Sequence, residues 1–167
     1  DLSVLNQRLV TAATCGTSGA LIGVVLFLYG RRRLGMSSPD AIMVSLLTVF
    51  GTIVFPYSTI LMTHVPTALF LLLSVVWLPE RPLAAGVSAG LATACFYVCG
   101  AAAVLLAVIL WSCSTWRKAL RSAVGAFPFA VLLGLYHLTY FGSPWRTALQ
   151  ASPFTDRALM FGVLQLP

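Results

Sequence analysis

The side chains best suited to chemistry lie in GTIVFPYSTILMTHVPTALF, positions 51–70, within the longest stretch of the chain that has no Asp, Glu, Lys or Arg. Tyr57, Ser58 and His64 offer hydroxyl and imidazole groups that can hydrogen-bond a phosphate or a sugar hydroxyl. Polar groups and irregular backbone are costly in lipid unless protein or water covers them. We therefore predict that this stretch is either a turn at a membrane surface or part of a binding site.

Three roles are open for His64. It can be a hydrogen-bonded packing or interfacial residue, a contact to a phosphate or sugar at the external membrane surface, or a ligand to a haem or chlorin. His137 is the only other histidine, and it is predicted to lie near the same leaflet, so a bis-histidine haem is an alternative. Two histidines alone do not define such a site, and no cofactor is assigned.

A second polar cluster, FGSPWRTALQASPFTDR, follows the last apolar segment. It contains Ser143, and its Arg146 and Arg157 each present a planar fork of donors that can clamp a phosphate or diphosphate. Either arginine can instead meet lipid phosphate. Asp156 can act as a general base, or it can be a helix cap or an ion-pair partner. No residue of the chain is therefore assigned as catalytic.

Other common chemistries leave no pattern in the chain. The four cysteines lie within or beside apolar segments, and CFYVC has the spacing of one helical turn rather than that of a CxxC zinc or redox site. We find no metal-spaced cluster, Gly-rich phosphate loop or Ser/His/Asp constellation. The net charge of +6 comes from ten basic residues at the ends of apolar runs, which argues against a nucleic-acid partner.

The composition is typical of an integral membrane protein whose main partner is the lipid bilayer. Of the 167 residues, 59% are hydrophobic and 8% are charged, whereas soluble domains carry about 25% charged residues. A membrane span needs roughly 20 apolar residues. We predict an all-α, polytopic transmembrane helix bundle in a bacterial inner membrane, with about six helical segments and extracytoplasmic loops, forming a single domain over residues 1–167.

The apolar runs and their flanking residues define the helices that must position the polar clusters. Ser38 is the predicted N-cap of the second helix, and Leu83–Cys113 is either one long span or two short ones. Two short spans place seven of the ten basic residues on the cytoplasmic side, so the positive-inside rule favours them. The tail, residues 142–167, is then an extracytoplasmic interfacial loop. The other predicted helices are Leu9–Gly30, about Pro39–Phe55, about Val65–Leu78 and about Arg121–Phe141, and the predicted cytoplasmic clusters are Arg31–Arg33 and Arg117–Arg121.

The order of motifs resembles the middle portion of polytopic glycosyltransferases of the GT-C class, in particular bacterial relatives of protein O-mannosyltransferases and aminoarabinose transferases. The resemblance spans roughly Leu9 to Leu149 and is carried by RRRLGMSSPDA, GTIVFPYSTILMTHVPTALFLLL, GVSAGLATACFYVCGAAAVLLAVIL and YHLTYFGSPWRTAL. This family transfers a sugar from a polyprenyl-phosphate donor to an acceptor on the extracytoplasmic face.

The resemblance implies that Tyr57, Ser58 and His64 lie near the donor site, and that Ser143 and Arg146 lie in an external loop close to it. It also implies a multi-helix bundle with large external loops. The partner would be a polyprenyl-phosphate-linked sugar.

The family's catalytic acid lies in a first external loop that would precede Asp1. The chain also starts without a methionine or a signal peptide, so we expect a fragment of a longer chain that is inactive by itself. The alternative is a noncatalytic accessory subunit of a larger photosynthetic or respiratory complex. Gly86, Gly90 and Ala94 recur every four residues, a spacing that suits contacts with other transmembrane subunits.

Overall fold

All the regular structure in the described part of the chain is helical. The computed structural model describes residues 2–96, 99–101, 104–105, 108 and 116–143. The all-α prediction is confirmed for these residues. In chain order the elements are α1 (Leu2–Thr11), the π-helix η1 (Ala12–Gly16), α2 (Thr17–Arg32), α3 (Ser38–Phe50), α4 (Val54–Ser58), α5 (His64–Trp77), α6 (Pro82–Cys95) and α8 (Trp116–Phe141).

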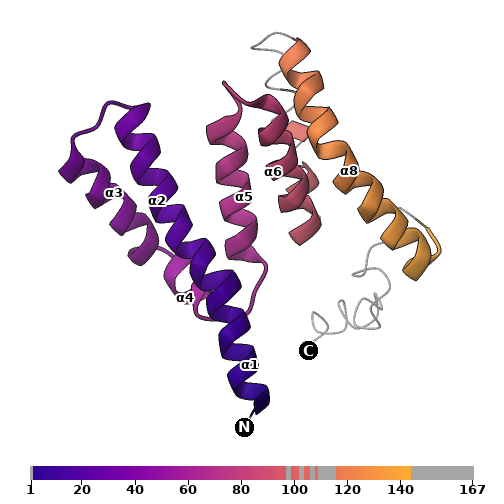
Figure 1. Ribbon diagram of the computed structural model, residues 1–167, viewed down its shortest axis with the longest axis horizontal. Coiled ribbons are helices and arrows are strands. Elements are labelled where there is room, and N and C mark those ends of the chain that lie inside the picture. The colour runs from indigo at the N-terminus through magenta and orange to yellow at the C-terminus, as the bar shows by residue number, and fades with distance from the viewer. Residues whose placement is uncertain (1, 97–98, 102–103, 106–107, 109–115, 144–167) are drawn as a thin grey trace, which may run out of the picture.

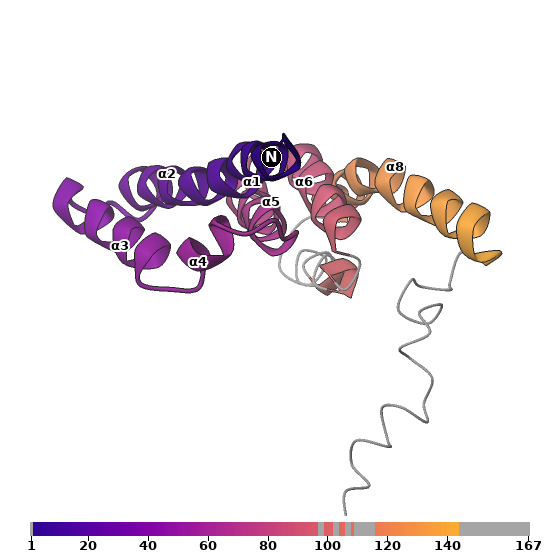
Figure 2. The ribbon, with the colours of Figure 1, turned by 90° about the horizontal axis from the view of Figure 1, so that it is seen from below.

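The long helices lie side by side in one curved row. The row runs α3, α2, α5, α6, α8, and each helix packs on the next (Figures 1 and 2). The small α4 lies beside α2 and α3. The described helices thus form an open row. Within the described part of the chain, each inner helix of the row packs on two long helices and leaves much of its remaining surface uncovered.

Much of this uncovered surface is apolar. Leu47, Phe127 and Leu132 are 57%, 66% and 63% exposed, and exposed apolar surface costs about 25 cal/mol per Å² in water. Two helical stretches are long and apolar enough to cross a membrane, namely Leu2–Arg32 with 31 residues and Trp116–Phe141 with 26. Helices α3, α5 and α6 are apolar but have only 13, 14 and 14 residues. Six membrane spans therefore stay a prediction.

The best-defined apolar core joins α2 to α5. Ile22 on α2 and Val65 and Leu69 on α5 are each no more than 5% exposed. Val54 and Tyr57 of α4 pack against this cluster. The core thus fixes α4, which carries two of the predicted site residues, against α2 and α5.

Helices α6 and α8 are parallel and approach closely through glycines. A Cβ added at Gly86 would collide with the backbone of Ser122, and one added at Gly90 would collide with the ring of Phe129. Small residues allow helix backbones to come this near. Because α6 ends at Cys95 and α8 starts again at the end where α6 began (Figure 1), a single continuous helix over 83–113 is wrong.

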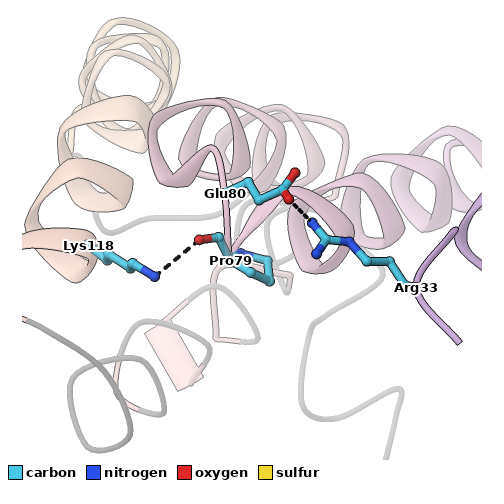
Figure 3. A network of polar contacts seen from close by, with 4 residues as sticks. All are labelled: Arg33, Pro79, Glu80 and Lys118. Carbon is cyan, nitrogen blue, oxygen red and sulfur yellow. Dashed lines mark hydrogen bonds and ion pairs between the residues drawn. The ribbon is translucent and has the colours of Figure 1, made fainter.

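Two polar contacts join helix ends on one side of the row (Figure 3). Arg33 Nη2 of the chain just after α2 lies 2.5 Å from Glu80 Oε1, and Lys118 Nζ of α8 donates to the carbonyl oxygen of Pro79 at 3.1 Å. The end of α2, the α5–α6 turn and the start of α8 therefore lie together. At this side of the row, α2 and α5 end and α6 and α8 begin. We call it the basic end, because it carries the cationic residues 31–33, 81, 117, 118 and 121.

Helix boundaries differ from the predicted ones where local chemistry decides them. Ser37, not Ser38, caps α3: its Oγ accepts from the backbone N–H of Asp40 at 3.3 Å and donates to the Asp40 carboxylate at 2.5 Å. This helix ends at Phe50 rather than Phe55, and the polar stretch after it forms the five-residue α4 instead of an open turn. By contrast, α5 lies within one residue of its predicted bounds.

The first and last helices also start earlier than predicted. Helical structure begins at Leu2 rather than Leu9, and α8 begins at Trp116 rather than Arg121. Polar residues in these added turns are tolerated, because they lie at the ends of the helices rather than midway along them. Of the predicted interfacial loop at 142–167, only Gly142 and Ser143 belong to the described residues.

Candidate functional site

A groove of about 530 Å³ opens on the side opposite the basic end. It lies between α1, η1 and the residues that end α4. We call it the α1–α4 groove. Ser58, one of the predicted site residues, lines it. Among the described lining residues, Arg8 alone is charged at neutral pH. The described lining residues are Val4, Gln7, Arg8, Thr11, Ala12, Gly16, Ser58, Thr59, Ile60 and Leu61.

The hydroxyl groups along this groove already donate to backbone carbonyl oxygens. Ser58 Oγ donates to the carbonyl four residues earlier at 2.7 Å, Thr59 Oγ1 to the one three residues earlier at 2.7 Å, and Thr11 Oγ1 to the one four residues earlier at 2.8 Å. A hydroxyl has one proton, so in this arrangement these oxygens can accept from a ligand but not donate to it. An anion in the groove would therefore depend on the donors of Arg8 and Gln7.

The π-helix η1 forms part of the groove wall within an otherwise α-helical stretch. Its Cys15 is only 1% exposed, and the Sγ donates to the carbonyl oxygen of Met62 at 3.1 Å. This contact ties η1 to the connection between α4 and α5. Single π-helical turns inside α-helices occur frequently at functional sites.

A second groove of about 460 Å³ lies on the other side of this contact. Its walls combine the apolar residues Met62, Pro66 and Phe70 with hydroxyl groups from η1, α2 and Thr63. The hydroxyl of Ser18 in this wall donates to the carbonyl oxygen of Thr14 in η1, at 2.6 Å. The two grooves thus flank the π-helical turn, one on each side of the residues that follow α4.

Tyr57 and His64 lie together in an aromatic cluster rather than in the groove lining. Their ring centroids lie 5.6 Å apart at an interplanar angle of 70°, and His64 meets Phe96 edge-on at 5.3 Å. The Tyr57 ring also packs against the core between α2 and α5, which makes it a packing residue. His64, at the first position of α5, stays exposed.

Of the remaining predicted site residues, Ser143 is the one that the structure describes, and it lies away from this cluster. Ser143 follows the end of α8, and helices α5 and α6 lie between that end and α4 (Figures 1 and 2). Arg146 and Arg157 lie outside the described residues. His137 is 8% exposed, and its nearest aromatic rings are those of Tyr136 and Phe141 on the same helix.

Arg8 is the functional candidate that the sequence-based assignment missed. The signal available was its position: with Arg146 and Arg157 it is one of the three basic residues predicted on the non-cytoplasmic side. Nothing in the sequence indicated that Arg8 and Ser58 would line the same groove. Within the described residues, no group of three or more His, Cys, Asp or Glu side chains is arranged to hold a metal ion.

Comparison with protein-family models, with curated proteins and with solved structures found no match.

Proposed function

We propose that the chain is a membrane-embedded, GT-C-type glycosyltransferase component that binds a polyprenyl-phosphate-linked sugar at the extracytoplasmic face of a bacterial inner membrane. The observation that carries this proposal is the α1–α4 groove. It combines one cation, several acceptor oxygens and apolar walls, and it lies on the side of the molecule opposite the basic end. The positive-inside rule makes the basic end cytoplasmic, so the groove would face outward.

The parts of such a donor match the parts of the groove. The phosphate would be held by the Arg8 guanidinium, because planar donor forks suit phosphate oxygens. Sugar hydroxyls would donate to Ser58 and Thr59, whose oxygens keep accepting capacity. The prenyl chain would lie along apolar side chains such as Ile60 and Leu61, which are 44% and 51% exposed.

Among the described residues, the groove has no carboxylate to deprotonate an acceptor. Asp40 caps α3 and Glu80 pairs with Arg33, both at the basic end, and Asp1 and Asp156 lie outside the described residues. Since general-base catalysis needs a base within hydrogen-bond reach of the acceptor proton, we propose that these residues bind the donor without transferring the sugar by themselves.

Binding of a radiolabelled polyprenyl phosphate to the purified chain tests the proposal. The chain is placed in nanodiscs of phosphatidylcholine, and polyprenol without the phosphate serves as the ligand control. Arg8→Gln removes a hydrogen bond to a charged group, which is worth roughly 1.5–3 kcal/mol, so the Kd should rise at least about tenfold. Arg31→Gln removes one charge from the opposite end of α2 and should leave the Kd unchanged.

Equal binding of polyprenol and polyprenyl phosphate would contradict the assignment of a phosphate site. Equal weakening by the Arg8 and Arg31 variants would show nonspecific attraction to positive charge. Absence of saturable binding would favour the alternative, a noncatalytic accessory subunit.

The accessory-subunit alternative loses one of its supports. It depended partly on the spaced small residues of α6, but Gly86 and Gly90 already face α8 within the same chain. Ala94, the third residue of that series, is exposed. A single small residue gives little reason to expect a further transmembrane partner on this face.

A further inference from the structure

A separate groove of about 370 Å³ lies at the basic end, between the C-terminal parts of α2 and α5. We call it the α2–α5 groove. The lining residues from Val25 to Arg32 share one face of α2, and those from Leu73 to Trp77 share one face of α5. Arg33, Glu80 and Arg81 follow the ends of these helices. Along α2 and α5 toward the basic end, the lining changes from apolar to aromatic to charged. The residues are Val25, Leu28, Tyr29, Arg32 and Arg33 from the α2 side, and Leu73, Val76, Trp77, Glu80 and Arg81 from the α5 side.

The charged mouth of this groove carries excess positive charge. Arg33 pairs with Glu80, which leaves the guanidinium groups of Arg32 and Arg81. Within the described residues, neither of these two groups has a hydrogen-bond or ion-pair partner. Both side chains are exposed. The mouth is therefore complementary to an anion, and two planar donor forks suit phosphate oxygens in particular.

The rest of the lining indicates a ligand that is also apolar. Tyr29 and Trp77 are half-buried below the arginines, and such aromatic residues are enriched at membrane–water interfaces. Below them, Leu28 and Leu73 line an apolar part of the groove. A free phosphate would leave this part unused, and a zwitterionic lipid would not balance the charge of the mouth.

We propose that the α2–α5 groove binds one anionic phospholipid, whose phosphate headgroup lies on Arg32 and Arg81 and whose acyl chain lies between α2 and α5. Basic pockets between membrane helices on the cytoplasmic side are suited to such headgroups. The inference depends on membrane insertion but not on sugar transfer, because this groove lies at the basic end and the α1–α4 groove lies on the opposite side.

Lipid retention by the full chain tests this site. Phosphatidylglycerol is titrated into phosphatidylcholine nanodiscs that hold the chain, and the lipid that copurifies after detergent extraction is counted by native mass spectrometry. We expect one retained phosphatidylglycerol. The variant Arg32→Gln with Arg81→Gln should weaken its retention roughly 30-fold, about fivefold for each charge near the anionic headgroup. The matched control, Arg31→Gln with Arg121→Gln, removes the same charge from the basic end outside the groove and should change retention less than twofold.

A second measurement locates the acyl chain without altering any charge. Trp77 is kept as the only tryptophan, and brominated phosphatidylglycerol is used as a contact quencher. We expect its fluorescence to be quenched at lower lipid fraction than with brominated phosphatidylcholine. Equal quenching by the two lipids, equal loss of lipid in both double variants, or displacement of the lipid by inorganic phosphate would overturn the proposal.

These outcomes are separable from those for the proposed function. Loss of polyprenyl-phosphate binding in Arg8→Gln, with phosphatidylglycerol retention intact, would support both sites. If Arg8→Gln leaves polyprenyl-phosphate binding unchanged and the double variant at Arg32 and Arg81 loses phosphatidylglycerol retention, the donor site is refuted and the lipid site is supported.

Discussion

Replacing Gly86 by alanine tests the close contact between α6 and α8. An added Cβ would lie under 3.0 Å from three backbone atoms of Ser122, so the helices must move apart, and such overpacking costs about 1–3 kcal/mol. The higher helix propensity of alanine offsets up to about 1 kcal/mol of this. With the full offset we expect a net destabilisation of up to about 2 kcal/mol, which raises the unfolding equilibrium constant by up to roughly 30-fold. Unfolding in mixed micelles by increasing SDS, followed by circular dichroism, measures it.

Gly134 provides the matched control, because it lies in α8 with nothing within 4 Å of an added Cβ. Gly134→Ala should be neutral or stabilising, by up to about 1 kcal/mol. Gly125 faces the same contact from the other helix, with the Leu83 carbonyl and the Val87 amide beside it. The double variant at 86 and 125 should therefore cost less than the two single changes added together. Equal effects at 86 and 134 would refute the packing described here.

Three further changes test the rest of the fold. Ser37→Ala should destabilise the first turn of α3 by about 1 kcal/mol and speed hydrogen exchange there, whereas Ser38→Ala should not; equal effects would reassign the cap. In a background without the native cysteines, Thr59→Cys and Glu80→Cys should react with an impermeant thiol reagent from opposite sides of a vesicle, and labelling from the same side would contradict the membrane orientation. Glu80→Gln should lower the free energy of unfolding by less than about 1 kcal/mol, because the Glu80 and Arg33 side chains of the ion pair are 66% and 39% exposed. High salt should reduce this difference, and a loss of stability that salt leaves unchanged would contradict a screened surface pair.

Of the residues predicted from residue types alone, Ser58 lines the candidate groove. Polar side chains in the middle of an uncharged run indicated Tyr57, Ser58 and His64, and the structure brings Tyr57 and His64 within ring contact. Their division into a packing ring, an exposed imidazole and a groove-lining hydroxyl was not available from the sequence. It depends on which face of α4 meets the core, and a five-residue helix is too short for its periodicity to show that face.

The sequence by itself determined the helical class, the apolar runs and the accumulation of basic residues at their ends, because each of these follows from composition and local spacing. It also placed α5 within one residue, since His64 and Pro66 precede a long apolar run that the α5–α6 turn closes.

Only the tertiary structure decided the parallel pairing of α6 with α8, the two arginine-bearing grooves and the proximity of Arg8 to Ser58. These features join residues that are far apart in the chain, through glycines that allow close approach and through the one ion pair described between Arg33 and Glu80. Periodicity specifies which residues share a helix face, but not which helix covers that face, because that choice depends on the shape of both surfaces.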